Sequence, residues 1–111
     1  VLCMHYGNEF DEEPLADVLT AVTGVDYSKE ELLKIGERIW NLARLINVKR
    51  GFNRKDDMLP SRILQPLDEG PSAGKKIPYE EMLDIYYEVR GWDKNGVPTN
   101  EKLRELGLIG E

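Results

Sequence analysis

The longest periodic pattern of apolar residues lies between Ser28 and Pro60. Apolar side chains recur there every three or four residues, and the main stripe consists of Leu32, Ile35, Ile39, Leu42 and Ile46. Leu33, Trp40 and Ala43 widen this stripe. A period of about 3.6 residues, kept up over about five turns, predicts a long helix that is buried along one broad face.

Both ends of this long helix carry recognisable signals. Ser28 followed three residues later by Glu31 has the form of a capping box. Lys49 and Arg50 suit the negative end of the helix dipole, and Gly51 allows the left-handed conformation that stops a helix. The helix is therefore expected to follow Ser28 and to end near Arg50.

Gly36 interrupts the same helix. A glycine in a helix interior costs about 1 kcal/mol relative to alanine. Its presence predicts that another backbone passes close to this position, as in ordinary helix–helix packing.

Two more segments have a clear helical pattern. The segment from Asp11 to Thr23 carries acidic residues and a proline at its start, and Gly24 follows it. Its expected inner face consists of Leu15, Val18, Leu19 and Val22. The segment from Pro78 to Arg90 is followed by Gly91. Its expected inner face consists of Met82, Ile85, Tyr86 and Val89, flanked by Tyr79 and Leu83.

Two short helices complete the predicted fold. One covers Met58 to Leu64, with Asp56 or Asp57 as its cap and the side chains of Met58, Leu59, Ile63 and Leu64 facing inward. The other follows Thr99, runs through Leu103 and Leu106 and is closed by Gly107. Pro66 to Pro78 is too rich in proline and glycine for a helix or a central strand.

No segment shows the alternation of a strand over a useful length. The predicted fold class is all-α, a compact bundle of three main helices and two short ones with an irregular Pro/Gly-rich loop. With 111 residues, the chain is expected to form a single helical domain over residues 1–111.

Charge and composition narrow the possible partners. The formal net charge of −6 disfavours nucleic acid, because binding to phosphates needs a basic patch. No apolar run has the length of a membrane span, and no signal peptide is visible. A single cysteine excludes an internal disulfide framework and fits a reducing compartment, so we expect a cytoplasmic protein.

The residues alone offer little candidate chemistry. Cys3 and His5 lie two positions apart and would point the same way on an extended segment. A structural zinc site normally needs four such ligands, whereas a lone cysteine also fits a small buried apolar position. The paired carboxylates of the chain all lie near expected helix starts, where capping and the helix dipole explain them. These pairs are Glu12/Glu13, Asp56/Asp57 and Glu80/Glu81.

Two long strings carry a family resemblance. They are GERIWNLARLINVKRGFNRKDDMLPSRILQPL, from Gly36 to Leu67, and MLDIYYEVRGWDKNGVPTNEKLRELGL, from Met82 to Leu108. A Glu-Gly-Pro loop start lies between them, at Glu69 to Pro71. Through these strings nearly the whole chain resembles the C-terminal helical domain of the tungsten-containing aldehyde:ferredoxin oxidoreductase family.

The resemblance implies an activity and a set of cofactors. Enzymes of this family oxidise aldehydes to carboxylic acids at a tungsten held by two pterin dithiolenes. They pass the electrons through a [4Fe–4S] cluster to ferredoxin. The N-terminal domains of the same enzyme, ferredoxin and the aldehyde are therefore the expected partners, and the isolated chain is expected to be inactive and to bind no cofactor.

The family's Asp-x-x-Gly-Leu-Cys motif matches the start of the chain, Val1-Leu2-Cys3. Through this match, the resemblance implies that Cys3 is the last of four cluster ligands and that Leu2 lies beside a pterin. Val1 stands where the family has glycine, which makes a positive φ less accessible there.

Two alternatives remain from the sequence. A non-catalytic helical interaction module would keep the family's fold without its role, and a small metal-binding protein would use Cys3 and His5.

Overall fold

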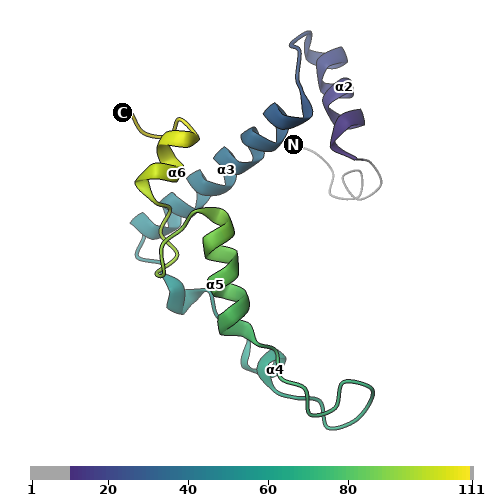
Figure 1. Cartoon of the computed structure of the whole chain (residues 1–111), viewed down its shortest axis with the longest axis vertical. Coiled ribbons are helices and arrows are strands. Elements are labelled where there is room, and N and C mark those ends of the chain that lie inside the picture. Colours follow the sequence, from purple (N-terminus) through teal and green to yellow (C-terminus); the bar gives the residue numbers. More distant parts are fainter. Residues whose placement is uncertain (1–10, 111) are drawn as a thin grey trace. The chain divides into compact units, whose positions relative to one another are not determined.

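The structure is a computed structural model that describes residues 11–110. It contains the α-helices α2 (Glu12–Thr23), α3 (Lys29–Lys49), α4 (Ser61–Leu64), α5 (Tyr79–Arg90) and α6 (Asn100–Glu105), and the 3₁₀-helix η1 (Arg54–Asp56) (Figure 1). Over the described residues, β pairing is limited to the isolated bridges Leu67–Ala73 and Trp92–Pro98. The all-α prediction, with three long and two short helices, is confirmed.

The chain divides into two compact units at the boundary between Trp40 and Asn41. Helix α3 crosses this boundary and contributes residues to both units. The first unit contains α2 and the first half of α3, and the second contains all the elements that follow.

Local contacts hold the first unit together. The Lys29 ammonium lies 3.1 Å from the Glu12 carboxylate, and the backbone N–H of Tyr27 donates to the Thr20 hydroxyl at 2.9 Å. Ala16 is the buried residue of α2. The connection between the two helices is thus fixed by hydrogen bonds and an ion pair as well as by packing.

The predicted ends of the three long helices and the predicted cap of α6 are confirmed. The Ser28 hydroxyl accepts from the backbone N–H of Glu31 at 3.1 Å, and the Glu31 carboxylate accepts from the backbone N–H of Ser28 at 2.9 Å. These two bonds form the predicted capping box. Gly91 ends α5 with a φ of 67°, and the Thr99 hydroxyl accepts from the backbone N–H of Lys102 at the start of α6.

The second unit has a small aromatic core. Leu83 and Tyr87 of α5 pack with Trp92, which follows the helix directly, while Tyr79 and Tyr86 cover the edges. In α6 and just after it, Leu103 and Leu106 are also buried. Trp92 anchors the exit of α5, with an exposure of 8%.

Most side chains predicted to form the inner faces of the long helices are exposed among the described residues, so this prediction is wrong there. On α3, Ile39, Leu42 and Ile46 are 64%, 48% and 45% exposed, whereas Asn41 and Arg44 are buried. The same reversal occurs on α5, where Met82, Ile85 and Val89 are exposed. On α2, Val18 and Val22 are exposed as well. In the second unit the apolar stripes lie outward because polar and aromatic side chains on other faces make the contacts within the unit.

The predicted caps of the short helix after η1 are also wrong. Helix α4 begins only at Ser61, after Pro60, and no side chain caps it. Asp56 instead closes a capping box with Asn53 on η1, and Asp57 turns to other partners. Of the four side chains expected to face inward, Met58 and Ile63 are 49% and 50% exposed.

Gly36 does not mark a close backbone approach within the described residues. A Cβ built at Gly36 would meet no described atom within 4 Å. The predicted close packing is therefore not found among the described residues.

No helix within residues 11–110 combines the length and the apolar character to cross a bilayer.

Candidate functional site

The predicted cofactor residues lie outside the part of the chain that the structure describes. Leu2 and Cys3, together with His5, belong to residues 1–10. Within residues 11–110, no group of three or more His, Cys, Asp or Glu side chains could hold a metal ion. The assignments of Leu2 and Cys3 therefore remain predictions.

The described residues instead bring together a buried polar and aromatic cluster in the second unit. We call it the Arg44 cluster, and it consists of Asn41, Arg44, Asp57, Tyr87, Trp92 and Gly96. Its members come from α3, from the residue after η1, from α5 and from the segment between α5 and α6. The cluster therefore joins four segments that are far apart in the sequence.

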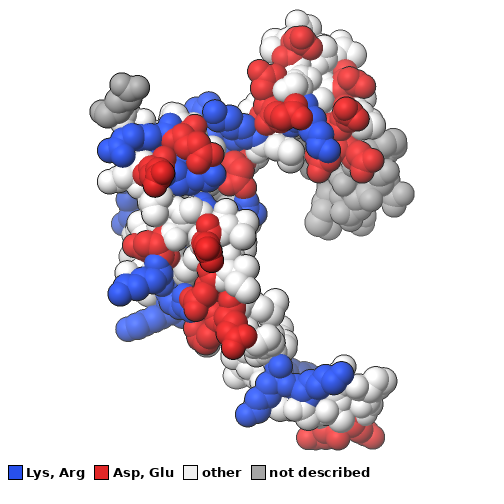
Figure 2. Space-filling model, viewed as in Figure 1, with Lys and Arg blue, Asp and Glu red and all other residues white. Residues whose placement is uncertain are grey.

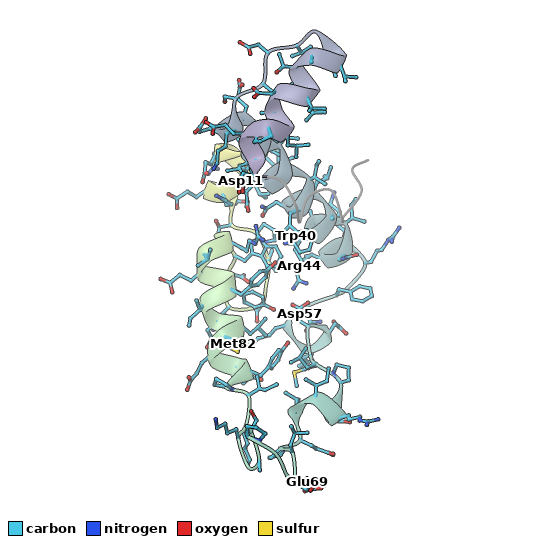
Figure 3. The ribbon with its side chains drawn as sticks, turned by 90° about the vertical axis from the view of Figure 1, so that its right-hand side faces the viewer. Asp11, Trp40, Arg44, Asp57, Glu69 and Met82 are labelled. Carbon is cyan, nitrogen blue, oxygen red and sulfur yellow. The ribbon has the colours of Figure 1, made fainter. Side chains whose placement is uncertain are left out.

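Arg44 is the centre of the cluster. Its Nη1 and Nη2 atoms donate to the two carboxylate oxygens of Asp57 at 2.7 and 2.5 Å, and its Nε donates to the carbonyl oxygen of Gly96 at 2.7 Å. This is the bidentate arrangement that the planar guanidinium favours. Figure 3 shows Arg44 and Asp57 pointing toward one another beside α5.

Tyr87 completes the surroundings of Asp57. Its hydroxyl donates to Oδ2 of Asp57, the oxygen that also accepts from Arg44. Because Tyr87 is only 2% exposed, its hydroxyl needs a partner within the protein, and Asp57 supplies it.

Within the cluster, Trp92 contacts both residues that come from α3, Asn41 and Arg44. Its indole Nε1 donates to Oδ1 of Asn41 at 2.8 Å, and the Arg44 guanidinium lies 4.9 Å from the centre of its ring. Tyr86 packs edge-on against Trp92 with ring centres 5.6 Å apart. These contacts explain why Asn41, a polar residue, is fully buried on a helix.

Gly96 leaves room for the cluster. A Cβ at this position would lie 2.2 Å from Nη2 of Arg44 and 2.7 Å from the hydroxyl oxygen of Tyr87. The backbone of Gly96 also has a φ of 77°, which side chains rarely allow. The turn of Asp93 to Gly96 is held by the Asp93 carboxylate, which accepts from the backbone N–H of Asn95 and of Val97.

A second arginine clamps η1 onto α5. Nη2 of Arg54 donates to Glu80 at 2.7 Å, and Nη1 donates to Asp84 at 2.6 Å. The same guanidinium lies 5.4 Å from the centre of the Tyr87 ring. Both carboxylates are well exposed, so salt should weaken this clamp.

The Arg44 cluster fixes the charge states of its members. Burial alone would raise the pKa of Asp57, but the hydrogen bonds from Arg44 and Tyr87 outweigh it and lower the pKa. Burial and the hydrogen bond to Asp57 raise the pKa of the Tyr87 phenol far above its usual value. For Arg44, the bonds to Asp57 outweigh burial and raise the pKa of the guanidinium.

These charge states limit what the cluster can do. Around neutral pH, Arg44 stays charged, Asp57 stays ionised and Tyr87 stays protonated, so none of them is suited to exchange protons with a substrate. Every buried side-chain nitrogen and oxygen among the described residues has a partner. The arrangement is that of a structural lock between helices.

The sequence pattern did not predict these contacts, although the two long strings contain all the residues of the Arg44 cluster. Asp56 and Asp57 were both expected to act as caps or dipole partners, and only Asp56 does so. The available signal was the side of α3 that faces away from the apolar stripe. Asn41 and Arg44 lie there one turn apart, and the pattern of apolar residues says nothing about them.

Comparison with known proteins identifies the family of the chain. The family model described as aldehyde ferredoxin oxidoreductase, domains 2 and 3, matches residues 1–108. The chain is 46% identical over 109 residues to a tungsten-containing aldehyde ferredoxin oxidoreductase of Pyrococcus abyssi, and this match covers 96% of the chain. It is 37% identical over 108 residues to the WOR-like subunit of an aliphatic sulfonate oxidoreductase of Pyrococcus furiosus, across 89% of the chain.

A solved structure agrees with these matches. The active-site complex BamBC of benzoyl coenzyme A reductase, in complex with 1,5-dienoyl-CoA, superposes with a TM-score of 0.72 at 30% identity over 89% of this chain. The chain belongs to the aldehyde ferredoxin oxidoreductase family. It spans 18% of the length of the Pyrococcus abyssi relative and 14% of the matched chain in the solved structure.

Proposed function

We propose that residues 1–111 form a helical domain at the C-terminal end of a tungsten-dependent aldehyde:ferredoxin oxidoreductase. The observation that carries this proposal is the match to tungsten-containing aldehyde ferredoxin oxidoreductases at 44–46% identity over 96% of the chain. The complete enzyme would oxidise an aldehyde to a carboxylic acid in the cytoplasm and pass the electrons to ferredoxin.

The contribution of this chain to the cofactors would come from its first residues. Cys3 offers one thiolate, and a [4Fe–4S] cluster needs four. This donor set fits a chain that completes a cluster held mainly by another part of the enzyme. Cys3 would be that fourth ligand, and Leu2 would line the pterin pocket. The cluster, when bound, supplies one-electron transfer to the carrier protein.

The Arg44 cluster would serve this function as a scaffold. It locks α3, η1, α5 and the Asp93–Gly96 turn into one unit without offering reactive groups of its own. A rigid unit of this kind holds its surface side chains in a fixed arrangement. Its role in the enzyme is therefore to present surfaces to the other domains.

Assay of the complete enzyme tests the proposal. After expression with tungstate, the purified full-length protein should reduce ferredoxin when an aldehyde is added, and it should contain tungsten and iron. A tungsten- and iron-loaded protein that oxidises no aldehyde would overturn the proposed reaction.

The alternative is a non-catalytic helical module, which the valine at position 1 keeps open. The sequence before Val1 separates the two functions. A C-x-x-C-x-x-x-C pattern a few hundred residues upstream supports the enzyme, and a chain without it supports the module.

A further inference from the structure

One face of α5 is apolar and uncovered. Met82, Ile85 and Val89 are 56%, 60% and 76% exposed, and we call these three residues the α5 ridge. Their spacing of three and four residues places them in one row along the helix. An apolar row of this kind has the pattern of a buried helix face, yet no described residue buries it.

The packing of α5 within its unit makes the exposure of the ridge a fixed feature. Leu83 and Tyr87 point to the other side of the helix, into the core. The lock between Tyr87 and Asp57 prevents the helix from rotating to bury the ridge instead. The second unit therefore cannot cover the ridge with its own core residues without breaking the Arg44 cluster.

A groove continues the ridge at the N-terminal end of α5. It has a volume of about 340 Å³, and its walls include Met58, Leu64, Ile77 and Tyr79 together with the acidic residues Glu80 and Glu81. Pro78, four residues before Met82, also lines it. Row and groove together form a mostly apolar strip, with acidic residues on one wall of a hollow that could receive a side chain of a partner.

Charged residues border the ridge without entering it. Glu81 and Glu88 lie on the neighbouring side of the helix, and Figure 2 shows acidic side chains along α5 with uncharged surface beside them. An apolar strip with a polar border is typical of a protein–protein contact. The absence of charge in the row itself argues against docking guided by opposite charges.

We propose that the α5 ridge and its groove are covered by a preceding part of the same polypeptide. This inference rests on the proposed function, because it requires the complete enzyme. The chain spans only 18% of the length of its relatives, so a much larger remainder of the enzyme is available to cover the strip. A covalently attached partner also needs no charge to guide its approach.

Cysteine labelling in the full-length enzyme tests this assignment. Ile85→Cys and Val89→Cys place a thiol on the ridge, and Glu88→Cys places the same thiol on the bordering side of the same helix, away from the groove. Each native variant is treated with a maleimide, and labelling at the introduced cysteine is followed by peptide mass spectrometry. The reaction is repeated after denaturation as a reference.

The ridge thiols should react at least tenfold more slowly than the thiol at position 88 in the native enzyme, and at the same rate after denaturation. Equal native rates would overturn the proposal, as would ridge protection that disappears when a dimer is diluted to monomers. Aldehyde oxidation is measured on the same samples. Equal labelling in an enzyme that oxidises aldehydes rejects only the proposal that the ridge is covered. An unsubstituted enzyme that oxidises no aldehyde rejects the proposed function.

Discussion

At the scale of single residues, the structure depends on one buried charge pair. The Arg44 guanidinium is 9% exposed and finds its counter-charge in Asp57, which Tyr87 also binds. Burial of either charge alone would be costly, so each depends on the other. Asp56, one position earlier, makes only an exposed capping bond to the backbone of Asn53.

This contrast predicts different effects for two neighbouring substitutions. Asp57→Asn should lower the free energy of unfolding by about 3 kcal/mol, because it leaves the Arg44 charge buried without its partner. Asp56→Asn, the matched control, should cost about 1 kcal/mol or less, as for other capping residues. Denaturant unfolding of both variants measures the difference, and equal losses would contradict the importance of the buried pair.

The same pair predicts how stability depends on pH. Burial alone would raise the pKa of folded Asp57, but hydrogen bonds from Arg44 and Tyr87 outweigh it and lower the pKa. The contribution of Asp57 to the free energy of unfolding is therefore complete above the unfolded pKa of about 3.9. The contribution is lost as the pH falls through the lowered folded value. Unfolding measured from pH 6 downward should therefore show a shallower acid loss in Asp57→Asn than in the unsubstituted chain. Parallel curves would argue against the lowered pKa.

At the scale of elements, the sequence predicted where helices begin and end better than it predicted which side they bury. The capping box of Ser28 and Glu31 and the Thr99 cap are local signals, and both are present in the structure. The buried side depends on contacts between distant segments, which no local pattern contains. On α3, the contact of Asn41 with Trp92 spans 51 positions, so the apolar period pointed to the uncovered side.

The turn between α5 and α6 shows the same dependence on distant contacts. The Asp-Lys-Asn-Gly composition favours a tight turn, and hydrogen bonds of the Asp93 carboxylate hold it. The reason for glycine at position 96 is the side chain of Arg44, which lies 52 positions away and could not be inferred from the turn itself.

This proximity predicts an unusually large cost for Gly96→Ala. Gly51→Ala is the control, since Gly51 also has a positive φ of 97° but no described atom lies within 4 Å of an added Cβ. Both substitutions should cost about 1–2 kcal/mol from the left-handed backbone. Gly96→Ala should cost about 2 kcal/mol more, because Arg44 and Tyr87 must move. Thermal unfolding of the two variants checks this order, and a control that is equally destabilised would contradict it.

At the scale of the whole molecule, the described residues form a scaffold whose apolar surfaces point outward. The exposed apolar rows on α3 and α5 were expected to be core. Under the proposed function, the rest of the enzyme covers such rows, so they would be buried in the complete protein. The long specific strings identified the family correctly from sequence, and the family model covers the same residues. The chemistry assigned to the first residues depends on the remainder of the enzyme and stays a prediction.

The assignment of Cys3 as the fourth ligand of the cluster in a larger oxidoreductase is the central proposal. Its most direct test is the iron content and the cluster spectrum of the full-length enzyme carrying Cys3→Ala, beside His5→Ala as a control in the same segment. We predict that the Cys3→Ala enzyme lacks the [4Fe–4S] cluster and no longer reduces ferredoxin, while the His5→Ala enzyme keeps the cluster. A Cys3→Ala enzyme with a fully occupied cluster would contradict it.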